Sequence, residues 1–162
     1  MDLTKLFSMQ KDLDEKIETQ HQLQDESLIE RKILALLVEI GELANETRCF
    51  KFWSLKPPAP INVILEEYVD GIHFILSLGL EINIEVTLSF ESIQAERNVT
   101  EQFLKVYEVV HAFKEEQTIR SYKNMLAEYL FLGQLLGFSN EQVKDAYVSK
   151  NEVNHVRQQQ GY

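Results

Sequence analysis

The sequence of 162 residues is poor in cysteine, in proline and in positive charge. Its single cysteine, Cys49, excludes an internal disulfide and any cysteine-rich zinc site. Acidic residues outnumber basic ones by 26 to 16, which gives a formal net charge of −10. Because such a surface repels phosphate backbones, we expect no direct nucleic-acid binding.

Long apolar runs are missing as well, since none approaches the roughly 20 residues that cross a membrane. The first residues also lack the basic-then-apolar pattern of a secretory signal. We therefore expect a cytoplasmic protein without a membrane partner. The apolar share of 44% is enough for a hydrophobic core, and the length fits a single domain over residues 1–162.

All three prolines lie between positions 57 and 60, and this cluster is the clearest break in an otherwise helical pattern. Apolar residues at helical spacing predict six helices. They run from about residue 3 to 22, from 28 towards 49, from about 63 to 78, from 98 onward, from 119 to 136, and from 139 onward. The predicted fold class is an all-α helical bundle.

Local signals mark several helix ends. Three pairs have the spacing of a capping box, in which a small polar residue precedes a Glu or Gln by three positions: Ser27 and Glu30, Asn98 and Glu101, and Ser139 and Gln142. Gly137 is expected to close the fifth helix, and Phe138 with Val143 forms a hydrophobic staple for the sixth.

The stretch after the third helix has a different pattern. Four apolar residues alternate there with polar ones, as in a half-buried strand: Ile82, Ile84, Val86 and Leu88. Because one short strand has no partner in this chain, we expect an extended or 3₁₀ connector.

Two acidic pairs stand out in the second and third helices. Glu39 with Glu42, and Glu67 with Asp70, are each three positions apart, so both carboxylates of a pair lie within about 60° on one helix face. The plain alternative is two solvated acidic faces. The flanking residues are apolar nearly all round, however, as in buried helices. Because buried carboxylates are costly without a cation, the four favour a divalent metal site, which Glu46 would extend.

The residues around these pairs resemble a known family. The two acidic pairs are similar to those of the all-α nucleoside triphosphate pyrophosphatase superfamily, which includes the MazG proteins and the dimeric dUTPases. Residues 42–53, residues 70–74 and the tail over residues 147–162 resemble the dimeric dUTPase branch. The resemblance implies a dimeric all-α enzyme that hydrolyses dUTP, and usually dUDP, to dUMP.

The resemblance also implies a metal-dependent mechanism. Glu39, Glu42, Glu67 and Asp70 would together bind two or more Mg²⁺ ions, for which Mn²⁺ is expected to substitute. One residue of the first pair must also polarise the attacking water. We favour Glu39 for this catalytic role and leave Glu42 open.

For the base, the family pattern places four residues in a uracil pocket: Gln10, Trp53, His73 and Phe74. Phe74 would stack on the base and His73 would hydrogen-bond near it, whereas the plain alternative for both is core packing. Family members often carry an amide one turn after the glutamine, but this chain has Asp14 there.

For the phosphates, Lys150, Asn154 and Arg157 form one stripe of the last helix, with Asn151 beside it. A stripe with two cations that faces an acidic, metal-filled cleft can bind phosphate oxygens. The plain alternative is the solvated end of a terminal helix. The family match favours the phosphate-binding interpretation.

Two other functions stay open. A related pyrophosphatase acting on dCTP or on non-standard nucleotides would carry the same acidic pairs, which do not choose the base. A compact dUTPase fold of the kind found in bacterial viruses would also serve as a binding partner for a regulatory protein, namely a repressor.

A homodimer is expected on separate grounds. Six apolar residues in the fourth and fifth helices present more apolar surface than so short a chain is expected to bury. Exposed apolar stripes of this kind are typical of surfaces that bind a second copy. The six residues are Phe103, Val106, Tyr107, Phe113, Phe131 and Leu132.

Overall fold

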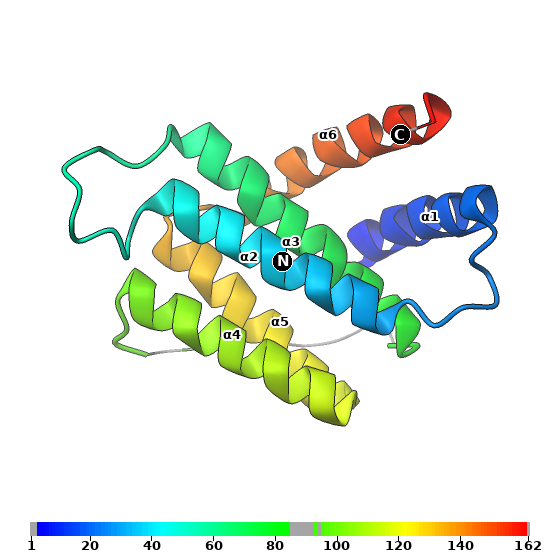
Figure 1. Cartoon of the computed structure of the whole chain (residues 1–162), viewed down its shortest axis with the longest axis horizontal. Helices are drawn as coiled ribbons and strands as arrows, with labels where there is room; N and C mark the ends of the chain where they lie inside the picture. The colour runs from blue at the N-terminus through cyan, green and yellow to red at the C-terminus, as the bar shows by residue number, and fades with distance from the viewer. Residues whose placement is uncertain (1–2, 85–92, 94, 162) are drawn as a thin grey trace.

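The computed structural model describes residues 3–84, 93 and 95–161, and this part of the chain folds into six α-helices without a β-strand (Figure 1). The predicted all-α class is confirmed. None of the helices in the described ranges is long and apolar enough to cross a membrane. The helices are α1 (Thr4–His21), α2 (Ile29–Thr47), α3 (Ile61–Glu81), α4 (Val99–Glu116), α5 (Ile119–Leu135) and α6 (Asn140–Gln159).

Two of the three predicted capping boxes are confirmed. Asn98 caps α4 and Ser139 caps α6, and each side chain accepts a hydrogen bond from the backbone N–H three residues on. The predicted box at Ser27 is wrong, because α2 has Leu28 at its N-cap without a side-chain hydrogen bond. Leu28 is buried, and burying such a side chain is worth more than the ~1 kcal/mol of a cap. Thr118 caps α5 with a box that the sequence search missed, because serine replaces Glu or Gln at its third position.

Helix α3 is longer at both ends than the predicted range of about 63 to 78. It begins at Ile61 because Pro60 is its N-cap, with a carbonyl that accepts hydrogen bonds from the backbone N–H groups of Val63 and Ile64. It continues to Glu81, where the carboxylate pairs with Lys32 of α2 at 2.5 Å.

The predicted connector lies only partly within the described residues. Ile82 and Asn83 form a turn, in which Asn83 has a positive φ of 53°, and Ile84 is buried without regular structure. Val86 and Leu88 lie outside the described residues. The turn therefore ends α3, and the rest of this prediction stays a prediction.

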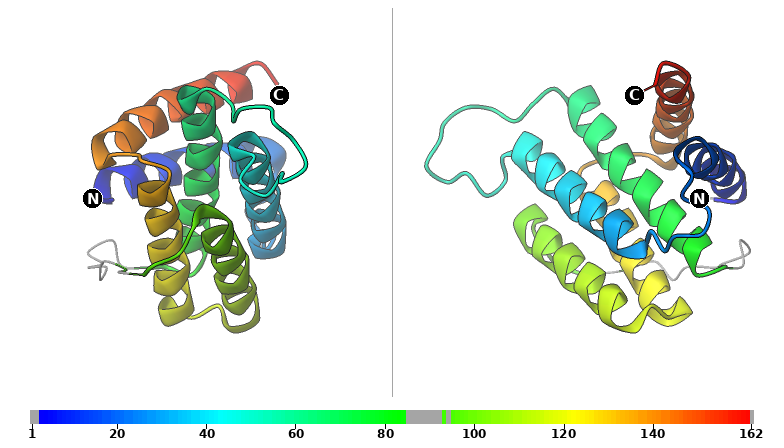
Figure 2. Two further views of the ribbon diagram at one scale, coloured as in Figure 1. Left: turned by 90° about the vertical axis from the view of Figure 1, so that its left-hand side faces the viewer. Right: turned by 45° about the vertical axis from the view of Figure 1, so that its right-hand side comes forward.

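Helix α3 is the centre of the bundle. It contacts α1, α2, α5 and α6, while α4 packs against α2 and α5. In Figure 2, α1 and α6 lie together on one side of α3, and the α4–α5 pair lies on the other. A site built on α3 is therefore reached by side chains from several parts of the sequence.

The apolar residues expected to form an uncovered stripe are inside the single chain. That expectation is wrong for five of the six, because α4 and α5 pack against each other and turn these side chains into the core: Phe103, Val106, Phe113, Phe131 and Leu132. Tyr107 is half-buried, and its hydroxyl lies 3.3 Å from the carbonyl oxygen of Leu37. These residues give no support to a dimer.

A reciprocal pair of tyrosines joins α3 to α5. Tyr68 and Tyr129 are fully buried and stacked with their ring centres 4.8 Å apart. Each hydroxyl donates a hydrogen bond to the other residue's backbone carbonyl, at 3.2 Å from Tyr68 and 2.9 Å from Tyr129. The hydroxyls fit because glycines face them. A Cβ at Gly71 would lie 2.0 Å from the Tyr129 oxygen, and one at Gly133 would lie 2.5 Å from the Tyr68 oxygen.

Replacing Gly71 by alanine should therefore destabilise the fold by about 2–4 kcal/mol, because the added methyl displaces the Tyr129 hydroxyl and unpairs a buried polar group. Gly41→Ala in α2 is the matched control. Its added Cβ would meet only the Tyr107 hydroxyl at 3.4 Å, so alanine's helix propensity should make it neutral or up to about 1 kcal/mol stabilising. Urea unfolding followed by circular dichroism measures both, and an equal loss for the two variants would contradict the tyrosine pairing.

Candidate active site

Three of the four predicted metal ligands come together in the structure. Carboxylate oxygens of Glu39 from α2 and of Glu67 and Asp70 from α3 all lie within 4.8 Å of one another. Glu42 is exposed and does not belong to this group. Burial, followed by the charges of Asp70, Glu42 and Glu67, raises the pKa of Glu39 to about 7. Glu42 thus acts on the group through its charge.

The donor set of these three carboxylates, which we name the acidic trio (Glu39, Glu67 and Asp70), fits a hard divalent cation. All donors are oxygens, all three side chains are partly buried, and the pKa of each is raised, first by burial. Part of the repulsion is offset by Lys150 of α6, whose Nζ lies 2.7 Å from Asp70 Oδ2 and 2.9 Å from Glu66 Oε1. Lys150 together with Arg157, whose charge also acts on Asp70, supplies two positive charges against the four carboxylates of the trio and Glu66, so a bound cation would relieve the remaining repulsion.

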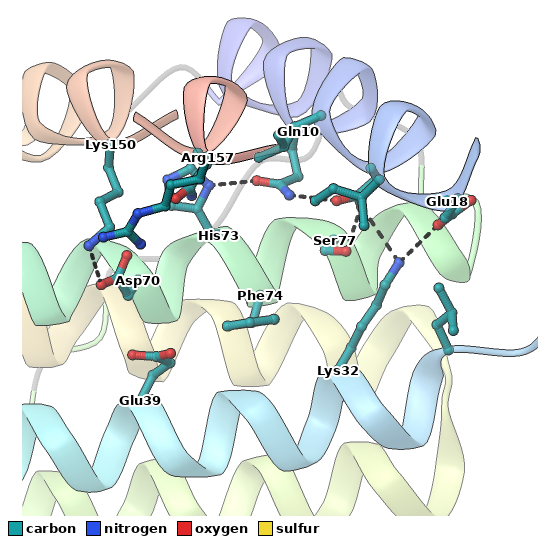
Figure 3. Close-up of a pocket in the computed structure, with 15 residues that line it drawn as sticks. Gln10, Glu18, Lys32, Glu39, Asp70, His73, Phe74, Ser77, Lys150 and Arg157 are labelled. Atoms are coloured by element: carbon teal, nitrogen blue, oxygen red, sulfur yellow. Dashed lines mark hydrogen bonds and ion pairs between the residues drawn. The ribbon is translucent and has the colours of Figure 1, made fainter. Parts of the chain in front are cut away.

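Two residues of the acidic trio, Glu39 and Asp70, line a pocket of about 380 Å³ between α1, α2, α3 and α6 (Figure 3). Most of the predicted substrate residues line this pocket together with Glu39 and Asp70: Gln10, His73, Phe74, Lys150, Asn154 and Arg157. In Figure 3, Phe74 lies between the acidic end, with Glu39, and the opposite end, with Lys32.

Two predicted substrate residues are not among those lining the pocket. Trp53 lies in the loop after α2 with 64% of its surface exposed, and its ring makes edge contacts with Phe52 and Phe50. Asn151 is buried, and its amide donates a hydrogen bond to the carbonyl of Met9 at 3.4 Å, which holds α6 against α1. Within one chain, neither side chain reaches the pocket.

Other pocket residues were missed by the sequence analysis. Lys32, Ser77 and Asp14 line the pocket as a connected polar group. A signal for the first two was present, because Lys32 precedes Glu39 by seven residues and Ser77 follows Asp70 by seven, which places each pair on one helix face. Asp14 was noticed only as a departure from the family pattern.

His73 lies at the inner wall of the pocket and is only 5% exposed. Its Nδ1 lies 2.8 Å from Gln10 Oε1, and its ring stacks on Tyr147 with centres 4.1 Å apart. Burial, and to a lesser extent the charge of Lys150, lowers the pKa of His73 to about 3. The ring is therefore neutral at physiological pH.

With this geometry in place, the comparisons with known proteins decide the family. A family model described as dUTPase matches residues 2–162. The chain belongs to the dUTPase family. A comparison with curated proteins gave no match. Membership makes the chain a dUTP diphosphatase, and its six-helix fold is consistent with the dimeric all-α branch and with placement among the MazG-like pyrophosphatases.

The raised pKa of Glu39 makes the stability of the metal-free dUTPase depend on pH. The folded state holds this proton more tightly than the unfolded chain, so the free energy of unfolding should fall as the pH rises from 4.5 to about 7. Glu39→Gln removes the part of this dependence that comes from Glu39 and should stabilise the protein by about 1–2 kcal/mol near pH 8. Urea unfolding in a chelator at about pH 5 and about pH 8 measures the effect. Glu152→Gln on the exposed face of α6 is the control, and an E39Q variant no more stable than its parent near pH 8 would refute the charge assignment.

Proposed function

We propose that the enzyme hydrolyses dUTP, and also dUDP, to dUMP in a magnesium-dependent reaction, and thereby removes dUTP from the nucleotide pool and supplies dUMP. Family membership supports the choice of dUTP. The observation that carries the mechanism is the placement of Glu39 and Asp70 in one pocket with two cations of α6, Lys150 and Arg157. Carboxylates for a metal and cations for phosphate oxygens are the groups that this chemistry needs.

The metal would be held by the acidic trio, with Glu42 as the fourth ligand, as two or more Mg²⁺ ions that Mn²⁺ can replace. When bound, these ions neutralise the polyphosphate and orient a water in line with phosphorus. Glu39, which is more buried than the exposed Glu42, is the proposed group that takes up the proton of the water. Glu42 is the alternative, since its charge acts on Glu39.

The two ends of the nucleotide would meet different residues. Lys150, Asn154 and Arg157 share one face of α6 along the pocket and would bind phosphate oxygens. Asn151 would support them indirectly by holding α6 against α1. At the base, Phe74 would stack on uracil, and His73 with Gln10 would provide hydrogen bonds.

A panel of nucleotides tests the activity. With Mg²⁺ we expect dUTP to be the preferred substrate, dUDP to be hydrolysed, and dCTP and dTTP to be poor substrates, whereas a chelator should abolish turnover. Asp70→Asn should lower kcat/KM about 100-fold or more, with Glu152→Gln as the matched exposed control. Preferred hydrolysis of dCTP or of a non-standard nucleotide would favour the related pyrophosphatase. No hydrolysis of any nucleotide would refute the proposal and favour a binding protein.

We also propose that the enzyme is a homodimer, joined through the aromatic loop of residues 50–55. Phe52, Trp53 and Leu55 in this loop are 94%, 64% and 104% exposed, and contiguous apolar surface of this kind is typical of an interface. We place Trp53 at this contact rather than in the pocket of its own chain. Light scattering at micromolar concentration should give about twice 18.9 kDa, and Phe52→Ser with Leu55→Ser should shift the mass towards the monomer. A monomeric parent protein would refute the dimer.

Three further parts of the proposal concern the whole chain. Residues 1–162 act as one domain, supported by a hydrophobic core to which all six helices contribute. The enzyme works in the cytoplasm, which suits its lone, unpaired Cys49. A regulatory protein that uses the aromatic loop would have to bind in place of the second copy, because the same exposed apolar residues form the proposed dimer contact.

A further inference from the structure

Asp14, the residue that departs from the family pattern, accepts hydrogen bonds from two neighbours. Gln10 donates through Nε2 to Asp14 Oδ1 at 2.7 Å, and Ser77 donates through Oγ to Asp14 Oδ2 at 2.5 Å. Lys32 Nζ lies 3.6 Å from the same Oδ2. Three donor groups from three helices therefore surround one carboxylate.

The Asp14 carboxylate determines how the amide of Gln10 is oriented. A carboxylate only accepts hydrogen bonds, so the amide must turn its NH₂ group towards Asp14 and its oxygen away. That oxygen, Oε1, lies 2.7 Å from the Tyr147 hydroxyl and 2.8 Å from His73 Nδ1. Both of these groups must then donate to it.

The orientation of Gln10 in turn determines which nitrogen of His73 carries the proton. Because Gln10 Oε1 can only accept, Nδ1 must be the protonated nitrogen, and in a neutral ring Nε2 is then bare. Nε2 is buried, and among the residues that the structure describes it has no hydrogen-bond partner. The pocket wall thus contains a buried acceptor that lacks a donor.

We propose that Asp14 is a positioning residue for base selection: it orients Gln10, holds the proton of His73 on Nδ1 and leaves Nε2 as an acceptor for a ring N–H of the base. This inference rests on the proposed function for its substrate class. Uracil carries a donor at N3, whereas cytosine has an acceptor at that position. An acceptor left unpaired by the wrong base lowers affinity strongly, so a fixed tautomer favours the uracil nucleotide.

Among the neighbours that this chain has, Gln10, Ser77 and Lys32, an amide at position 14 would not fix the orientation of Gln10. Asparagine both donates and accepts, so Gln10 could turn its NH₂ group towards His73 and the proton of the ring could move to Nε2. Asp14→Asn keeps the size of the side chain, removes its negative charge and lets it donate as well as accept hydrogen bonds. It is therefore the variant that separates positioning from packing.

The first measurement is the ¹⁵N spectrum of the imidazole rings in the nucleotide-free protein, in which protonated and bare nitrogens resonate far apart. His73→Gln identifies the signal of His73. We expect Nδ1–H in the parent and in Ser77→Ala, which leaves the carboxylate in place, and a mixture of the two tautomers in Asp14→Asn. An Nε2–H ring in the parent, or an unchanged tautomer in Asp14→Asn, would overturn the inference. The parent spectrum decides this even where Asp14→Asn fails to fold.

The second measurement is the ratio of kcat/KM for dUTP to that for dCTP. Asp14→Asn should lower this ratio about tenfold, equivalent to roughly 1.4 kcal/mol. Asp12→Asn, an exposed change on the same helix, should leave it unaltered. A shifted tautomer with an unchanged ratio would refute the role in base selection. An inactive parent would refute the proposed function instead, because the ¹⁵N measurement needs no turnover.

Discussion

The interlocked pair of Tyr68 and Tyr129 fixes the position of α3, and the site depends on that position. The pair holds α3 against α5 by two reciprocal hydrogen bonds, and it is possible only because Gly71 and Gly133 leave room for the hydroxyls. Asp70 directly precedes Gly71, so the backbone that places this carboxylate is the backbone that accommodates the Tyr129 hydroxyl. A slide of α3 by even part of a turn would break both hydrogen bonds and would also move Glu67 and Asp70 relative to Glu39 of α2.

The charged and the neutral parts of the site follow one another along α3. The stripe of α3 that faces the pocket runs from Asp70 through His73 and Phe74 to Ser77, at the spacing of successive helical turns. Its first residue belongs to a group of mutually repelling carboxylates, and its last belongs to the hydrogen-bonded group around Asp14. Between these two ionic groups the pocket wall is aromatic and neutral.

The sequence could predict those parts of the structure that depend only on residues close together in the chain. The caps at Asn98 and Ser139 need only a few residues, and the acidic trio followed from helical spacing within apolar flanks. Contacts between helices were the limit. The assignment of Trp53 to the pocket rested on the resemblance alone, and in the single chain Trp53 lies exposed in the loop after α2. The network around Asp14 exists only because α1 packs against α3. Spacing within one helix does not report which side chain from another helix lies opposite.

The overall charge of −10 raises the question of how such a protein accepts a polyanion. Charge acts locally here, because screening limits its reach to about 8 Å in physiological salt. Lys150 and Arg157 stand on α6 beside the acidic trio, so any cation bound by the trio would add its charge to theirs at one end of the pocket. Lys32 offers no such attraction at the other end, since Asp14, Glu18 and Glu81 already surround it and, although burial opposes its charge, raise its pKa. With a cation bound by the acidic trio, the pocket would attract phosphate at that end alone, and a nucleotide that followed this asymmetry would bring its uncharged base towards Phe74 and His73.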